Sequence, residues 1–137
     1  MLDHTADVGF ELEAPTLEHL FDEARQALLM VVFERPPQEG DEEEEIRLSA
    51  PDRETLLVRW LNELNYLIRD TGFVPARAEI GIQEADETGY ALGARLAGAP
   101  LLPEEYGWQG EVKSATFHGL EVVDGDDRLH ARVILDV

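Results

Sequence analysis

Two stretches of helical periodicity followed by two-residue alternation most strongly constrain the fold of this chain. Apolar residues recur at helical spacing from Leu17 to Phe33 and again from Leu56 to Ile68. From residue 76 to the last residues, most apolar side chains instead alternate with polar or small ones, as in strands with one buried face. Helices that precede a run of strands are typical of an α+β domain.

Local signals predict where the two helices begin and end. Thr16 and Asp52 precede the two periodic stretches and are residue types that cap helix N-termini. The proline pair at 36–37 ends the first helix, and Gly72 ends the second. The sequence therefore predicts one helix at about 17–33 and another at about 53–71.

The remaining chain predicts six strands and a single domain over residues 1–137. The expected strands cover residues 8–13, 46–48, 76–82, 90–96, 111–123 and 128–136. We expect hairpin turns at 86–89 and 124–127, an acidic loop at 38–45 and a long loop at 97–110. The predicted fold is a two-layer α+β domain of order β-α-β-α-β-β-β-β, with a mostly antiparallel sheet and two helices on one face.

Composition limits the partners and the compartment. The formal net charge is −19, which repels nucleic acid and anionic lipid, so we expect no direct nucleic-acid or membrane binding. A basic protein or a cation would be attracted by this negative charge, although the charge also increases solubility. There is no cysteine, no long apolar run and no signal-peptide pattern, so we expect a cytoplasmic protein.

No motif of an enzyme is visible in the sequence. The chain contains no glycine-rich phosphate loop, no Gly-x-Ser-x-Gly element and no His-x-x-x-His pair among its four histidines. The acidic run at 41–45 is interpreted as a solvated loop, and the acidic turn at 124–127 lacks the ligand spacing of a calcium loop. We therefore expect no catalytic residue and no enzymatic activity.

Two aspartates at opposite ends of the chain form a candidate metal site. Asp7 begins the first predicted strand, and Asp136 ends the last one on the face of Arg132 and Ile134. If these strands are neighbours, both carboxylates and the terminal carboxylate of Val137 converge into an all-oxygen site for calcium or magnesium. Periodicity leaves that adjacency open, and an exposed Asp136 needs no partner at all.

The strand at 111–123 holds the only lysine and a histidine. Alternation places Lys113 on one face and His118 on the other, so they cannot act as a pair unless a bulge intervenes. By pattern alone, His118 is interpreted as a hydrogen-bonded residue near the end of a strand.

Five segments in order resemble the archease family, and the resemblance covers essentially the full length. They are DHTADVGFE (3–11), TLEHLFDEA (16–24), LLVRWLNELNYL (56–67), EVKSATFH (111–118) and VILDV (133–137). Three positions depart from the family pattern: Ser114 stands for the usual Ala, Phe117 for Tyr, and Ala99 for Glu. Phe117 has no phenolic donor, so no role is carried over to it, nor to Ala99.

The resemblance implies an accessory protein of the GTP-dependent RtcB-type RNA ligase of tRNA splicing. Archeases are understood to promote guanylylation and multiple turnover of that ligase. The resemblance further implies a divalent-metal site at Asp7, Asp136 and Val137, with calcium the first candidate and magnesium or manganese the alternatives. His4, Lys113 and His118 match in identity and are expected to support the site or meet the partner. The alternative expectation is a general chaperone or a modulator of a tRNA methyltransferase.

Overall fold

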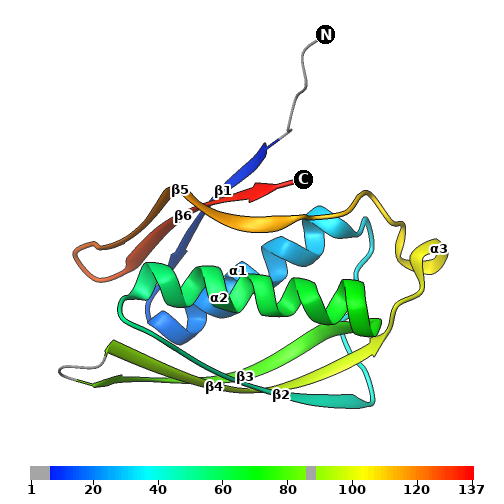
Figure 1. Cartoon of the computed structure of the whole chain (residues 1–137), viewed down its shortest axis with the longest axis horizontal. Coiled ribbons are helices and arrows are strands. Elements are labelled where there is room, and N and C mark those ends of the chain that lie inside the picture. The colour runs from blue at the N-terminus through cyan, green and yellow to red at the C-terminus, as the bar shows by residue number, and fades with distance from the viewer. Residues whose placement is uncertain (1–6, 86–88) are drawn as a thin grey trace, which may run out of the picture.

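The fold places a layer of helices between two antiparallel sheets. A computed structural model describes residues 7–85 and 89–137, and the side chains of these residues except Phe117 and His118. The elements follow in this order: β1 (Asp7–Ala14), α1 (Leu17–Val32), β2 (Glu42–Ala50), α2 (Arg53–Tyr66), a π-helical turn (Leu67–Thr71), β3 (Phe73–Ala85), β4 (Gly89–Pro100), α3 (Pro103–Tyr106), β5 (Ser114–Asp124) and β6 (Leu129–Asp136). One sheet has the order β1-β6-β5 and the other β2-β4-β3, with α1 and α2 between them (Figure 1).

The predicted helix ends are confirmed. Thr16 caps α1 by accepting a hydrogen bond from the N–H of His19 at 3.2 Å. Asp52 caps α2 in the same way, accepting from the N–H of Thr55 at 2.7 Å. The π-helical turn extends α2 to Gly72, whose φ of 71° is the left-handed conformation that glycine adopts at a helix C-terminus.

The core lies on both sides of the helix layer. Trp60 of α2 is fully buried, packs against Phe21 of α1, and donates a hydrogen bond from Nε1 to the main-chain oxygen of Phe21 at 2.9 Å. Buried residues cover a wide arc of α2, including Leu56, Leu57 and Val58. A helix with apolar residues over so wide an arc must be covered on more than one side.

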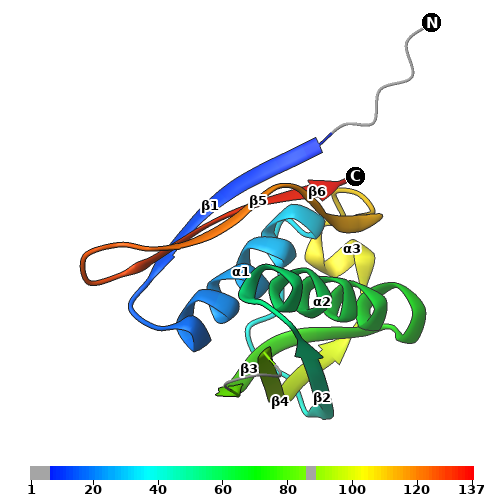
Figure 2. The same ribbon diagram turned by 60° about the vertical axis from the view of Figure 1, so that its left-hand side comes forward.

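That wide arc explains the one respect in which the architecture differs from the prediction. The α+β class, the order of helices and strands and the antiparallel pairing are confirmed. The six strands nevertheless divide into two three-stranded sheets, so the helices have a sheet on each side and not on one face only (Figure 2).

Three local predictions need correction. Most of the acidic run expected in a loop lies in β2, where Glu42, Glu43, Glu44 and Glu45 are exposed and pair with β4 through residues 95–98. The long loop at 97–110 is shorter, because β4 continues to Pro100 and α3 follows. The strand expected from Glu111 begins at Ser114, since Asn65 of α2 holds the preceding segment by donating to the main-chain oxygen of Val112 at 2.7 Å.

The two predicted hairpins have different outcomes. Gly125 donates its N–H to the main-chain oxygen of Arg128 at 2.7 Å, which confirms the turn between β5 and β6. The turn at 86–89 falls largely on residues 86–88, outside the described residues, although β3 and β4 pair up to Ala85 and Gly89. No helix in the described part of the chain is long and apolar enough to cross a membrane.

Candidate metal site

The first and last strands are neighbours, and their register brings the two candidate aspartates together. β1 and β6 lie side by side (Figure 1). They pair antiparallel without interruption, and Asp7 is directly opposite Asp136. Directly opposed residues in antiparallel strands project to the same face, with Cβ atoms about 4.5–5.5 Å apart. The adjacency that periodicity left open is therefore present.

Both aspartates lie on the face of their sheet that is turned away from the helices. In β6 the alternating residues Val133 and Leu135 are buried, whereas Arg132 is exposed and Asp136 is partly exposed. Asp7 is exposed. The site is thus open to a ligand or a partner on the outer face, while the buried residues of the same strands anchor it to the core.

One oxygen of Asp136 is without a hydrogen-bond partner among the described residues. Its Oδ1 is buried, and no described residue donates a hydrogen bond to it. A buried polar atom without a partner costs about 1–3 kcal/mol, and more when it carries charge. A carboxylate oxygen left in this way beside a second carboxylate fits a cation, which would satisfy both groups.

The surrounding main chain holds Asp136 in place. The N–H of Lys113 donates to the main-chain oxygen of Asp136 at 2.7 Å, and Ser114 of β5 lies opposite Asp136 on the other side. The row Asp7, Asp136 and Ser114 therefore runs across the three strands. Sequence reasoning missed Ser114, because only the register of β5 against β6 places it there.

The candidate ligands that the structure describes are all oxygen atoms. No cluster of three or more His, Asp or Glu side chains suited to a metal occurs among the described residues. The main-chain oxygen of Val137, which directly follows Asp136 and is half-buried, is the candidate third ligand. Oxygen ligands alone favour hard cations such as Ca²⁺ and Mg²⁺. His4 and Asp3 lie outside the described residues.

Carboxylates elsewhere on this outer face have cationic neighbours. Glu13 pairs with Arg128 at 2.9 Å and lies 3.8 Å from His130, and Glu11 is opposite Arg132. Asp7 and Asp136 make no ion pair with any residue that the structure describes. The aspartate pair is therefore a local excess of negative charge.

The two supporting residues of the 111–118 segment are placed only in part. Lys113 is exposed and precedes β5. The pairing of β5 with β6 shifts between Thr116 and Glu121, and Gly119 within this interval has a φ of 68°. The bulge that the sequence argument named as an exception is therefore present beyond Thr116, so alternation no longer assigns His118 to a face. The side chain of His118 itself lies outside the described residues.

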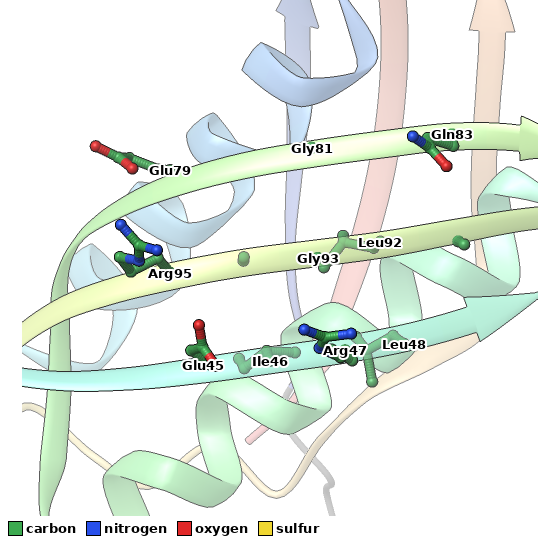
Figure 3. Close-up of a pocket in the computed structure, with 12 residues that line it drawn as sticks. Glu45, Ile46, Arg47, Leu48, Glu79, Gly81, Gln83, Leu92, Gly93 and Arg95 are labelled. Atoms are coloured by element: carbon green, nitrogen blue, oxygen red, sulfur yellow. The ribbon is translucent and has the colours of Figure 1, made fainter.

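A surface hollow lies on the outer face of the β2-β4-β3 sheet, across the helix layer from the aspartates. Its floor consists of small residues, including Gly81 and Gly93, and charged side chains stand around it (Figure 3). Arg95 lies between Glu45 and Glu79 in register, so acidic and basic groups are interleaved here. This hollow lacks the charge excess of the aspartate pair.

Two aromatic residues of the segment at 97–110, Tyr106 and Trp108, pack against Phe33. Tyr106 is buried against Phe33, with ring centroids 5.5 Å apart, and its hydroxyl donates to the main-chain oxygen of Pro100 at 2.9 Å. Burial raises the pKa of Tyr106, and the nearby Glu105 and Glu42 raise it further. Trp108 packs on the same Phe33 at 5.8 Å and remains 41% exposed.

Comparison with known proteins agrees with this architecture. The Archease protein family (MTH1598/TM1083) matches residues 1–137. Protein archease of Methanosarcina mazei is 32% identical over 136 residues, covering 99% of this chain and 93% of that protein. Protein archease of Methanothermobacter thermautotrophicus is 36% identical over 140 residues, covering 98% of this chain and 95% of that protein.

A solved structure supports the fold as well. The solution structure of Methanobacterium thermoautotrophicum protein 1598 superposes with a TM-score of 0.78 at 34% identity, covering 99% of this chain and 96% of that chain. The relatives' shared name is that of a protein family and not of an enzymatic reaction, in agreement with a non-enzymatic accessory protein. Over its whole length, this chain belongs to the archease family.

Proposed function

We propose that this chain activates a GTP-dependent RNA ligase of the RtcB type, through a divalent-cation site formed by Asp7, Asp136 and Val137. The observation that carries the proposal is the register of β1 against β6, which opposes two carboxylates on an outer face where Asp136 Oδ1 is buried and has no partner among the described residues. The absence of an enzyme motif in the sequence is consistent with action on another protein.

The residues of this chain would act by position and charge. Asp7 and Asp136 would hold a cation at one edge of an open sheet face, where a docked protein can reach it. When bound, a divalent cation supplies positive charge and coordination positions for anionic oxygens. The net charge of −19 would favour association with a basic, RNA-binding ligase cleft and speed the encounter.

The supporting residues have distinct expected roles. Lys113 would hold the end of β6 through its main-chain N–H, and its exposed side chain is available to a partner. His4 and His118 remain candidates through the family pattern alone. Calcium is the first candidate cation for an all-oxygen site, with magnesium and manganese as alternatives.

The test measures transfer of labelled GMP to the cognate ligase in the presence of GTP and a divalent metal. The wild-type protein should accelerate transfer when present in less than equimolar amount, and both Asp7→Ala and Asp136→Ala should reduce that acceleration at least about tenfold, as expected for loss of a metal ligand. Glu43→Ala is the matched control, since Glu43 is an exposed strand carboxylate on the other sheet.

Two results would contradict the proposal. The first is a lack of acceleration by the wild-type protein. The second is full acceleration by both aspartate variants once circular dichroism shows that they are folded. A change in the solubility or site choice of a tRNA methyltransferase, with no effect on the ligase, would favour the alternative role as a chaperone or methyltransferase modulator.

A further inference from the structure

The four sheet edges of this fold are not equally protected. Each three-stranded sheet has two edge strands, which are β1 and β5 in one sheet and β2 and β3 in the other. An edge strand presents unpaired N–H and C=O groups that can pair with another chain, so proteins usually cover or charge their edges. The protection of each edge therefore indicates where another strand can add.

Side chains of α1 cover the edge of β3. Arg25, which is 6% exposed, donates from Nη1 to the main-chain oxygens of Pro75 at 3.0 Å and Ala76 at 2.8 Å. Glu18 accepts from the N–H of Ile82 at 3.3 Å. Main-chain groups at both ends of this edge are thereby occupied.

Side chains of α2 cover the edge of β5 in the same manner. Asn62 accepts from the N–H of Ala115 at 2.7 Å, and Glu54 accepts from the N–H of Val122 at 3.2 Å. Arg53 donates to the main-chain oxygen of Val122 at 3.3 Å. This edge too is closed to an added strand.

The edge of β2 is protected by charge. Ile46 of β2 is buried, so alternation places Glu42 and Glu44 on the side of the strand that faces the helices. Charged residues that point inward on an edge strand discourage pairing. Arg59 of α2 also donates to the main-chain oxygen of Ser49.

In the part of the chain that the structure describes, the edge of β1 has none of these protections. β1 pairs with β6 over all eight of its residues without a bulge, and Val8, Phe10 and Leu12 on its inner side are half-buried and uncharged. Within residues 7–85 and 89–137, no side chain forms a hydrogen bond with the main chain of β1. Figure 2 shows β1 running along the border of its sheet, with α1 beneath it.

We propose that β1 is a docking edge for an extended, basic segment of a protein partner, which adds as a fourth strand beside it. Such strand addition uses main-chain hydrogen bonds for affinity and alternate side chains for specificity. The outer side of β1 carries Glu11 and Glu13, whose basic neighbours Arg132, Arg128 and His130 all come from β6 and the turn before it. On the side away from β6, these two carboxylates favour Lys or Arg at alternate positions of the partner. The half-buried inner side selects apolar residues between them.

The same charges exclude a second copy of this chain as the occupant. If two β1 strands paired, their outer carboxylates would lie opposite or diagonal to one another, and like charges across strands are destabilising. The net charge of −19 on each copy adds to this repulsion. The docking edge shares β1 with the aspartate site, but the inference rests on Glu11, Glu13 and the main chain of β1 and holds whether or not the ligase proposal is correct.

The test uses synthetic eight-residue peptides and the whole protein. The probe peptide has Lys or Arg at odd positions and Val or Thr at even positions, and its binding is followed by fluorescence anisotropy. A peptide of equal composition with its basic residues contiguous should bind at least about tenfold more weakly, because it cannot match both faces of β1. Of two peptides N-methylated on alternate residues, only the one whose methyl groups face β1 should lose binding.

Hydrogen exchange and charge reversal identify the edge. Bound probe should slow amide exchange within residues 7–14 and leave residues 42–50 unchanged. Glu11→Lys should weaken binding of the probe about threefold to tenfold and strengthen binding of an acidic version of the peptide, as cross-strand charge pairs predict. Glu79→Lys makes the same change on an exposed strand residue of the other sheet. It should alter neither the binding of the basic probe nor the binding of the acidic peptide.

Several outcomes would overturn the proposal. They are equal binding of the contiguous-charge peptide, equal effects of the two N-methylated peptides, and no protection of residues 7–14 in the complex. Dimerisation that protects residues 7–14 without any peptide would show that the occupant is a second copy. If Glu11→Lys does not fold, Glu11→Gln must show a smaller loss of affinity in the same direction.

Discussion

Removing one carboxylate from the Asp7–Asp136 pair should affect the metal-free and metal-loaded protein in opposite directions. In the metal-free state, the two directly opposed carboxylates repel each other. Cross-strand pairs of this kind contribute about 0.2–1 kcal/mol, so Asp7→Asn should stabilise the metal-free protein by that amount. Asp7 is the better position for this change because it is exposed and makes no ion pair with a described residue.

The metal-loaded protein should show the opposite effect. A cation at about 100 times its dissociation constant adds about 2.7 kcal/mol to the free energy of unfolding. For a chain of this length, each kcal/mol raises the melting temperature by about 3–5 °C. The wild-type melting temperature should therefore rise by about 8–13 °C on saturation, and that of Asp7→Asn should rise far less.

Thermal unfolding followed by circular dichroism measures both effects. Scans in EDTA and in CaCl₂, MgCl₂ or MnCl₂ are compared at equal ionic strength, because the net charge of −19 makes the chain responsive to any salt. Glu43→Gln controls for loss of one exposed strand carboxylate elsewhere. The reasoning is refuted if no divalent cation raises the wild-type melting temperature more than matched NaCl, or if Asp7→Asn responds as the wild type does.

Two further predictions concern stability. Arg25→Met should lower the free energy of unfolding by about 2–3 kcal/mol, since it leaves the main-chain oxygens of Pro75 and Ala76 without their charged donor. Urea denaturation measures this loss. An unchanged midpoint would contradict the role of Arg25 in covering the edge of β3. Asp52→Ala should cost about 1 kcal/mol at neutral pH through loss of the α2 cap. Hydrogen bonds from Thr55, first from its hydroxyl and then from its N–H, lower the pKa of Asp52 below its ordinary value of 3.8. A lowered folded-state pKa stabilises the protein above the unfolded-state value and loses this effect as pH falls through the folded-state value. The difference between wild type and Asp52→Ala should thus be constant above about pH 5 and shrink below about pH 4; a difference that grows on acidification would contradict it.

Local features of the sequence were sufficient to predict the helices. Thr16, Asp52 and Gly72 act through hydrogen bonds and backbone conformations within a few residues, so their roles are visible without tertiary structure. Alternation in the last strand correctly separated the buried Val133 and Leu135 from Arg132 and Asp136. The candidate metal ligands and the family pattern also came from the sequence.

Burial and pairing over long range decided the rest. The acidic residues 42–45 disfavour a strand locally, but β4 offers them a paired edge. The bulge of β5 beyond Thr116 interrupts an alternation that sequence alone would continue, and it limits what can be predicted for His118.

The sequence by itself determined the two main helices, the faces of β1 and β6 and the two aspartates, because each depends on neighbouring residues. Only the tertiary structure decided that Asp7 and Asp136 meet, that one buried Asp136 oxygen has no partner in the described part of the chain, and that the strands form two sheets. The physical reason is that the strands pair in the arrangement that buries the apolar surface on both sides of the helix layer. That selection depends on residues from the whole chain, and no local pattern encodes it.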